Sequence, residues 1–385
     1  MKILLLTQFF SDTRGGGEYV FSLLAKKLAE HENEVWVITN KIVKEQYITE
    51  KNIHIIFVKP TLQYAGGMPA GFSENIRYAI NAIRAGRKLA KENGIDIIHS
   101  NNFAPALAGS LLSSITSIPH ITTIHDVFSA CGKNHWKQWG AQASISKIGI
   151  MLAPLFEKLS VKLRMKCIHT VSEASRDDLV KLGAKKPIHV IHNSISGNTV
   201  SGNATQNQQF VSVGRLVFYK NLEIVIDAIG IIKKKHPKVR LIIVGDGPYR
   251  EKLVEHVSKL GLESSVIFAG YVNTKEKTQI ISESAAMVFP STCEGFGLVI
   301  LEAFLQKKPV LVSDIKPTSE IVDDEKTGYV IEPQDAALWA EKMSACIENP
   351  QKISEMGNNG YDTLESRYNQ DIMYEKIIKM YKQYK

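Results

Sequence analysis

The sequence of 385 residues contains no apolar run long enough to cross a membrane. Its most apolar stretch, residues 104–118, includes five hydroxyl side chains and is shorter than the ~18 to 20 residues that a spanning helix needs. The first residues, MKILLLTQFF, have an apolar run of only four residues before Thr7, too short for the core of a signal peptide. We therefore expect neither a membrane-spanning helix nor a signal peptide.

Cysteine is scarce, and its spacing does not suggest a metal site. The four cysteines, Cys131, Cys167, Cys293 and Cys346, include no CxxC pair and no zinc-ligand spacing. This pattern fits reduced thiols in a cytosolic protein. We therefore expect a cytoplasmic protein whose cysteines form no disulfides.

Acidic residues are too few in the first half of the chain to balance the basic ones. Residues 1–196 contain 24 Lys and Arg against 15 Asp and Glu, a net charge of +9, whereas the remainder has a net charge of −1. Such asymmetry favours an anionic membrane surface, a nucleic acid or a polyanionic substrate, or serves solubility alone. Because there is no helix-turn-helix, RNA-binding signature or arginine-rich tract, we expect no nucleic-acid partner.

Short apolar runs alternate with stretches of helical period along the whole chain. Such runs are typical of strands buried on both faces of a parallel sheet, and their alternation with helices predicts doubly wound α/β domains. We predict strands at residues 2–10, 34–40, 53–59, 95–100, 120–125, 167–172 and 188–192, and again at 210–214, 239–244, 265–269, 285–289, 309–313 and 328–331. Helices are expected at 17–31, 74–93, 104–117 and 173–182, and near the end at 335–347, 350–366 and 370–384.

Two domains are predicted, with a linker between them. Residues 194–209 are dominated by Ser, Gly, Asn, Thr and Gln and cannot build a core. We assign residues 1–196 to a first Rossmann-like domain and 197–366 to a second, and expect residues 367–385 to form a helix that returns to the first. Two such domains form a cleft, and ligands of these sheets bind beyond the carboxyl ends of the strands.

Two loops after predicted strands have residues suited to phosphate. Gly15, Gly16 and Gly17 precede a predicted helix, whose free N–H groups can bind an anion, although a flexible turn has the same composition. Arg215 and Lys220 follow the first strand of the second domain, and two such cations suit a diphosphate, although solvated surface cations are the simpler alternative. No Walker lysine and no GxGxxG motif accompanies them, which disfavours nucleotide hydrolysis and dinucleotide binding.

Two glutamates flank a Gly-Phe-Gly turn in the sequence STCEGFGLVILEAFLQ. We predict that a strand ends at Phe289 and that a helix begins near Leu298, which places Glu294 in a loop and Glu302 on the helix. Both carboxylates can accept hydrogen bonds from sugar hydroxyls, while the turn presents the N–H groups of Gly297, Leu298 and Val299 to an anion. Because Glu302 lies within an apolar stretch, we expect it to have a polar partner.

Taken together and in order, these motifs resemble family 4 of the retaining glycosyltransferases, also described as glycosyl transferases group 1. The resemblance rests on GGGE, TVSEAS, IHNSI, GRL with a following lysine, VGDGP and two glutamates eight positions apart, and it covers essentially the whole chain. It implies the GT-B fold, in which two Rossmann-like domains face a cleft. It also implies transfer of a hexose-type sugar from a UDP- or GDP-sugar to a hydroxyl acceptor, with retention and without a metal.

The resemblance also implies roles for individual residues. The implied catalytic residues are Glu294, His125, Arg215 and Lys220, with Arg215 and Lys220 holding the diphosphate and Glu294 contacting the donor sugar. Glu302 would bind the ribose hydroxyls, and Tyr271 and Val272 would face the base. The remaining implied donor-binding residues are Gly16, Gly17, Gly295, Phe296, Gly297, Leu298 and Val299. The alternatives are a nucleotide-sugar epimerase and a non-catalytic nucleotide-sugar-binding protein of the same fold.

The acceptor is expected on the basic first domain. Residues 152–166 predict a basic amphipathic helix with Pro154 in its first turn, which suits either an anionic membrane or an ordinary core. Just before it, Trp136 and Trp139 stand beside Lys133 and Lys137, a composition that favours a membrane interface or a carbohydrate platform. We therefore expect a glycan, lipid, lipid-linked glycan or other glycoconjugate acceptor, and weigh peripheral binding to the inner face of the cell membrane.

Overall fold

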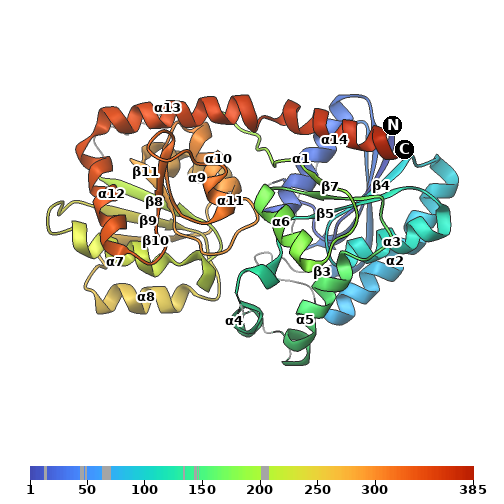
Figure 1. The fold of residues 1–385 in the computed structure, drawn as a ribbon, viewed down its shortest axis with the longest axis horizontal. Coiled ribbons are helices and arrows are strands. Elements are labelled where there is room, and N and C mark those ends of the chain that lie inside the picture. Colours follow the sequence, from blue (N-terminus) through green and yellow to red (C-terminus); the bar gives the residue numbers. More distant parts are fainter. Residues whose placement is uncertain are drawn as a thin grey trace. The chain divides into compact units, whose positions relative to one another are not determined.

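The computed structural model describes residues 1–12, 15–43, 47, 50–62, 71–132, 135–142, 145, 147–200 and 208–385. Their contacts divide the chain into two compact units (Figure 1). The first unit comprises Met1–Ser194 together with Gln370–Lys385, and the second comprises Ile195–Asn369. These bounds lie close to the predicted divisions after residues 196 and 366.

The described part of the first unit contains a seven-stranded parallel sheet in the order β3-β2-β1-β4-β5-β6-β7. This order steps outward from β1 in one direction and from β4 in the other, as in a doubly wound fold. The strands are β1 (Lys2–Leu6), β2 (Glu34–Ile42), β3 (Ile53–Leu62), β4 (Ile97–Ser100), β5 (His120–Ile124), β6 (Cys167–Thr170) and β7 (Ile188–Val190). The helical segments are α1 (Gly17–Glu30), α2 (Phe72–Asn93), α3 (Ala104–Thr116), η1 (Phe128–Ala130), α4 (His135–Gln142), α5 (Lys147–Ser160), α6 (Glu173–Leu182) and α14 (Gln370–Tyr384).

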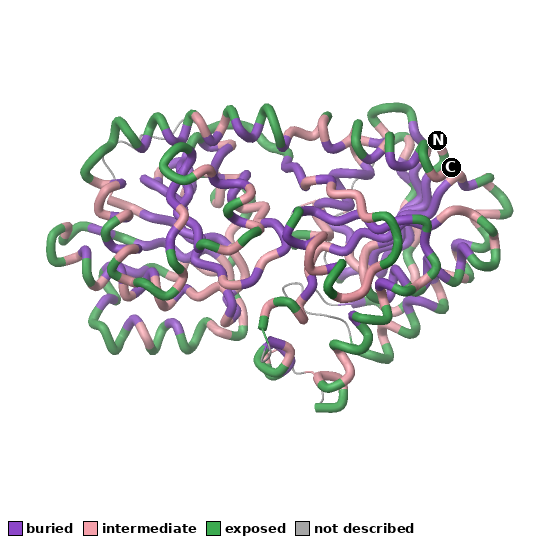
Figure 2. Tube along the Cα trace, viewed as in Figure 1, coloured by how far each residue is buried: buried purple, intermediate pink, exposed green. Residues whose placement is uncertain are grey.

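Alternate residues of β1 pack on opposite faces of this sheet. Ile3 and Leu5 lie in a core built with α1 and α14, whereas Leu4 and Leu6 lie in a second core built with α2 and α3. Side chains of a strand alternate between faces, so a run that is apolar at every position requires helices on both sides. Figure 2 shows the resulting continuous burial along the strands. The C-terminal helix α14 thus completes the core of the first unit.

The first strand is shorter than predicted. It ends at Leu6 instead of residue 10, because the chain turns at Thr7, whose hydroxyl donates to the carbonyl of Phe9 at 2.7 Å. The apolar side chain of Phe10 is nevertheless buried in the core with α1, which explains why the sequence pattern extends beyond the strand.

The second unit repeats the architecture with a six-stranded parallel sheet among its described residues, in the order β10-β9-β8-β11-β12-β13. One face is covered by a core that includes α7 and α12, while α9 and α10 pack on the other side. The strands are β8 (Gln209–Val213), β9 (Arg240–Val244), β10 (Val266–Gly270), β11 (Ala286–Phe289), β12 (Val310–Ser313) and β13 (Gly328–Ile331). The helical segments are η3 (Phe218–Lys220), α7 (Leu222–Ile232), α8 (Arg250–Lys259), α9 (Thr274–Glu283), α10 (Leu298–Leu305), α11 (Lys316–Ser319), α12 (Ala336–Glu348) and α13 (Pro350–Arg367).

The predicted basic amphipathic helix differs in its bounds. Helix α5 begins at Lys147 and ends at Ser160, so Pro154 lies in its interior instead of its first turn. A proline in a helix interior removes one backbone hydrogen bond and crowds the carbonyl four residues before it, so this position is less favourable than the predicted first turn. Arg164 and Lys166 follow the helix instead of belonging to it.

The two tryptophans that were expected at a membrane interface or carbohydrate platform differ in exposure. Trp139 on α4 is buried and stacks against Phe128, with ring centroids 6.3 Å apart. Trp136 is half-buried, and its indole N–H donates to the hydroxyl of Ser129 at 3.2 Å. Lys133 lies outside the described residues.

Within the described part of the chain, every helix is either too short or too polar to cross a bilayer.

Candidate functional site

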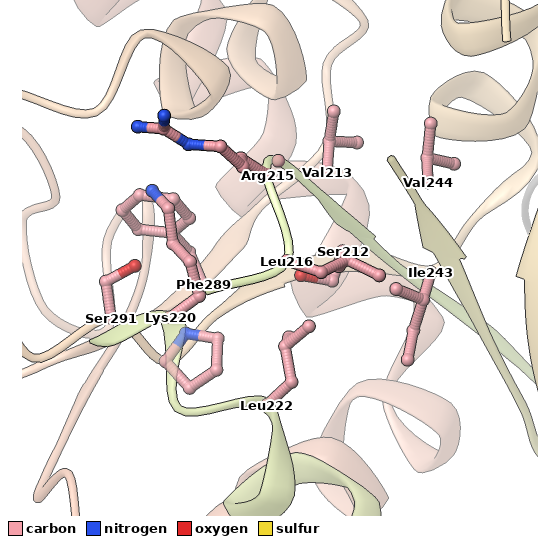
Figure 3. A pocket seen from close by; sticks show the side chains of 12 residues that line it. Ser212, Val213, Arg215, Leu216, Lys220, Leu222, Ile243, Val244, Phe289 and Ser291 are labelled. Carbon is pink, nitrogen blue, oxygen red and sulfur yellow. The ribbon is translucent and has the colours of Figure 1, made fainter. Parts of the chain in front are cut away.

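The end of β8 forms one wall of a small pocket in the second unit (Figure 3). The strand stops at Val213, and Gly214, with a φ of 156°, leads into Arg215 and then into the short helix η3, which ends at Lys220. The pocket is lined by Arg215 and Lys220 together with residues of the ends of β9 and β11. In Figure 3 the guanidinium of Arg215 and the ammonium of Lys220 lie on the same side of the pocket. This placement suits two cations that bind one diphosphate.

The glycines of the VGDGP motif allow two strand-end loops to touch. A Cβ on Gly245 would lie 2.0 Å from the carbonyl oxygen of Gly214, and one on Gly247 would lie 2.3 Å from that of Leu216. The two loops are also hydrogen-bonded, because the N–H of Leu216 donates to the carbonyl of Asp246 at 3.0 Å. The motif therefore fixes the backbone beside Arg215 through close approach.

Lys220 and Glu294 form an ion pair across this edge of the sheet. The ammonium of Lys220 donates to Oε1 of Glu294, and both side chains are largely shielded from solvent, with 18% and 13% exposed. The same ammonium lies 4.8 Å from the centre of the Phe289 ring. Glu294 lies in the loop after β11, as predicted, and the pair places one implied phosphate ligand next to the implied sugar ligand.

Helix α10 begins where the sequence predicted. Strand β11 ends at Phe289 and α10 starts at Leu298, with Gly297 as its N-cap in the left-handed region at a φ of 104°. The N–H groups of Leu298 and Val299 in this first turn have no carbonyl partner within the helix, and both residues are partly exposed. Together with the positive end of the helix dipole, they form a surface suited to an anion. Gly295 and Phe296 of the preceding loop are buried.

Glu302 has the polar partner that its apolar surroundings predicted. Lys277 on α9 donates to its Oε1 at 2.7 Å, and each of the two side chains is 24% exposed. The other oxygen, Oε2, is shielded from solvent and has no hydrogen-bond partner among the described residues. A buried carboxylate oxygen without a donor is costly, so this atom is a candidate to accept hydrogen bonds from a ligand.

Tyr271 and Val272 directly follow the end of β10 and precede α9. Tyr271 is 63% exposed and Val272 is partly exposed. Since β10 is parallel to β9, β8 and β11, these residues lie at the same edge of the sheet as Arg215 and the Glu294 loop. The implied donor-binding residues of the second unit therefore lie in the segments that follow β8, β10 and β11, including the first two turns of α10.

In the first unit, the glycine turn lies beside His125. Gly15 has a φ of 73°, Gly16 is the N-cap of α1, and a Cβ on Gly17 would crowd Nε2 of His125 at 3.1 Å and Nδ2 of Asn101 at 3.3 Å. His125 directly follows β5, and its Nε2 is shielded from solvent without a hydrogen-bond partner in the described chain. Burial, and secondarily His169, lowers the pKa of His125 to about 3, so the imidazole is neutral at physiological pH.

Two residues near these groups were not identified from the sequence. Lys277 donates to Glu302, and Asn101, which follows β4, lies beside Gly17 together with His125. The position of Asn101 after a buried strand is the kind of signal that could have revealed it. Lys277 lies on a helix that begins with a polar sequence typical of an exposed surface. Nothing in that sequence distinguishes it from its neighbours Lys275 and Glu276.

Comparisons with known proteins show which family the chain resembles. Residues 14–196 match the family model "Glycosyltransferase Family 4", and residues 198–363 match "Glycosyl transferases group 1". An uncharacterized glycosyltransferase of Methanocaldococcus jannaschii is 29% identical over 287 residues, which cover 74% of this chain and 75% of the relative.

Solved structures show the same fold over the full length. Sucrose-phosphate synthase of Thermosynechococcus elongatus has a TM-score of 0.81 at 19% identity, covering 99% of this chain and 98% of that one. The Anabaena protein HepE, in complex with UDP-glucose, has a TM-score of 0.75 at 20% identity, with both chains fully covered. The predicted fold, two Rossmann-like domains with parallel sheets, is confirmed. The chain belongs to family 4 of the glycosyltransferases and has the GT-B fold.

Proposed function

We propose that the protein transfers a hexose-type sugar from a nucleoside diphosphate sugar to a hydroxyl acceptor, with retention of anomeric configuration and without a bound metal. The observation that supports this most directly is the state of Glu302: Lys277 holds one of its oxygens, while the other is buried and lacks a donor. Ribose hydroxyls would supply the missing hydrogen bonds. The matched family models describe transferases, so an epimerase and a non-catalytic binding protein are not favoured.

The second unit offers positive groups where the diphosphate would depart. As the bond between the sugar C1 and the phosphate oxygen breaks, negative charge develops on the nucleoside diphosphate. Arg215, Lys220 and the N-terminus of α10 at Gly297 are proposed to stabilise this charge, which is the task that a metal ion performs in other transferases. The ion pair with Glu294 restrains Lys220 in this position.

The proposed reaction proceeds on one face of the sugar. The acceptor oxygen forms its bond to C1 on the side from which the diphosphate leaves, and the acceptor proton passes to the leaving phosphate oxygen. Glu294 is proposed to contact the donor sugar without becoming attached to it. A covalent sugar adduct accumulating on a Glu294→Gln variant would contradict this mechanism, because it would reveal a protein nucleophile.

Roles for residues of the first unit follow from the family resemblance. Gly16 and Gly17 are proposed to approach phosphate groups through their N–H groups, and neutral His125 to contact the donor sugar. A neutral imidazole can donate or accept a hydrogen bond without adding a charge, and Nε2 of His125 has no protein partner in the described chain. The acceptor is proposed to be a glycan, a lipid or another glycoconjugate.

Binding of the donor is tested by thermal shift with UDP, GDP, ADP and their sugars. A nucleotide at 100 times its dissociation constant should add ~2.7 kcal/mol to the free energy of unfolding. We expect stabilisation by nucleotides of one base only and its loss in Arg215→Ala. Lys234→Ala, on an exposed lysine of the second unit away from the strand ends, is the matched control. No shift with any nucleotide would contradict the proposed donor site.

Chemistry is tested separately from binding. Incubation with the stabilising nucleotide sugar and a panel of glycan and lipid acceptors should yield a product whose anomeric configuration, read by NMR, equals that of the donor. Excess EDTA should leave the rate unchanged. An inverted product would contradict retention, and a rate abolished by EDTA and restored by Mg²⁺ would contradict metal independence.

A further inference from the structure

Helix α5 turns its apolar side chains outward and its acidic side chain inward. Glu157, the single acidic residue of the helix, is only 4% exposed, whereas Ile148 and Met151 are 68% and 70% exposed. Leu155, Phe156 and Leu159 are about half exposed. A surface helix of a globular protein normally presents the reverse arrangement, with its apolar stripe toward the core. The five apolar residues are called the α5 face below.

Two hydrogen bonds fix this orientation. Both oxygens of Glu157 accept main-chain N–H groups at the start of η1, from Phe128 at 2.6 Å and from Ser129 at 2.9 Å. At 100° per residue, Glu157 lies opposite Ile148 and Leu159 on the helix. Anchoring the carboxylate therefore directs the α5 face to the surface, which Figure 2 shows as exposed.

The stretch of sequence that contains α5 is strongly basic. Between residues 97 and 172 the only acidic residues are Asp126 and the buried Glu157, against seven lysines and arginines. The six that the structure describes are all exposed, and none of them forms an ion pair with another described residue. They are Lys137, Lys147, Lys158, Lys162, Arg164 and Lys166.

We infer that the α5 face docks on an anionic lipid bilayer. The apolar side chains would enter the boundary between headgroups and acyl chains, while Lys147 and Lys158, which flank the face on the helix, would meet anionic headgroups. The surrounding charge argues against a second copy of the chain as the occupant. A symmetric contact would bring the same uncompensated positive charges together.

Docking through α5 would bring the first unit to the membrane surface. If the first unit binds the acceptor, the acceptor hydroxyl is then presented by a lipid or a lipid-linked glycan. This last step rests on the proposed function, whereas the docking itself does not, and the test below therefore uses no nucleotide sugar.

Co-sedimentation of the full-length protein with vesicles tests the inference. We expect binding to vesicles of phosphatidylcholine with phosphatidylglycerol at low salt, weaker binding at high salt, and little binding to phosphatidylcholine alone. Met151→Ser combined with Leu155→Ser should weaken binding by about tenfold or more. Lys147→Gln combined with Lys158→Gln should weaken it by about fivefold per lysine.

Matched variants in the second unit serve as controls. Ile231→Ser with Leu260→Ser removes two other exposed apolar side chains, 46% and 45% exposed, and Lys234→Gln with Lys238→Gln removes two exposed lysines. All variants should melt within a few degrees of the unchanged protein, since the replaced side chains are exposed. Nucleotide-induced thermal shifts without vesicles should be equal in the α5 variants and the unchanged protein.

Three results would overturn the inference. The first is absence of binding to anionic vesicles at low salt, and the second is equal loss of binding in the α5 and control variants. The third is a dimer in sedimentation velocity that the α5 variants convert to a monomer, without vesicle binding, which would show that a second copy covers the face. Vesicle binding in the absence of any nucleotide-induced thermal shift would support docking and contradict the proposed donor site.

Discussion

Lys220 of η3 and Glu294 of the loop after β11 form an ion pair although 74 positions separate them in the sequence. Because both side chains are largely shielded from solvent, the charge of each is compensated mainly by the charge of the other. The pair therefore links two strand-end loops of the second sheet, and its removal should affect both stability and donor binding.

Replacing only one partner of this pair should destabilise the second unit. Lys220→Met leaves Glu294 without its cation, and we expect a loss of ~1 to 3 kcal/mol in the free energy of unfolding, measured by urea denaturation. The double variant Lys220→Met with Glu294→Gln should recover part of this loss, because no uncompensated charge remains. Additive losses in the double variant would show that the two side chains are not coupled.

The ribose contact proposed for Glu302 predicts a specific discrimination. UDP, or whichever nucleotide binds, should bind about tenfold to 100-fold more tightly than its 2′,3′-dideoxy analogue, because hydrogen bonds to a charged acceptor contribute ~1.5 to 3 kcal/mol. Glu302→Ala should remove the difference by weakening mainly the natural nucleotide. Calorimetric titration of both ligands measures the ratio. An unchanged ratio in Glu302→Ala would contradict the proposed contact.

The buried histidines of the first unit predict loss of stability in mild acid. Burial lowers the pKa of His120 and His169 to about 4 and that of His125 to about 3. In the unfolded chain these groups titrate near 6.5, so unfolding takes up protons and the folded state loses stability as pH falls from about 6.5 toward about 4. Each group contributes a slope of at most ~1.4 kcal/mol per pH unit.

Urea denaturation between pH 8 and pH 5 measures this slope, above the range in which carboxyl groups dominate. His169→Gln should reduce the slope below pH 6.5, since one group with a shifted pKa is removed. His31→Gln, at an exposed histidine whose ring stacks on Tyr374, is the matched control. A free energy of unfolding independent of pH between 7 and 5 would contradict the prediction.

Much of this architecture could be predicted because buried parallel strands appear in the sequence as apolar runs. The end of β11 at Phe289 and the start of α10 at Leu298 followed from a run of apolar residues, a Gly-Phe-Gly turn and a resumed apolar period. The partner of Glu302 could not be predicted, since its contact with Lys277 depends on how α9 packs against α10.

The orientation of α5 shows a second limit. Its apolar spacing predicts an amphipathic helix, but the spacing is the same whether the apolar side faces the core or the surface. Two main-chain N–H groups at Phe128 and Ser129, far from Glu157 in the sequence, decide which side is buried. Similarly, the lysines near Trp139 in the sequence suggest a surface position, yet Trp139 is buried and stacks against Phe128.

The contact of α14 with the first sheet gives a final prediction. The hydroxyl of Tyr381 lies 2.6 Å from Nδ1 of His99, whose Nε2 lies 2.6 Å from the hydroxyl of Thr123, and all three side chains are buried. Tyr381→Phe keeps the ring and the apolar packing but leaves Nδ1 of His99 without a partner, which should cost ~1 to 3 kcal/mol of unfolding free energy. Tyr384→Phe, at the exposed end of the same helix, removes a hydrogen bond to the partly exposed His189 and should cost less. Urea denaturation of both variants compares the two losses. Equal, negligible losses would mean that water or another group satisfies His99, and that α14 is held to the sheet by its apolar side chains alone.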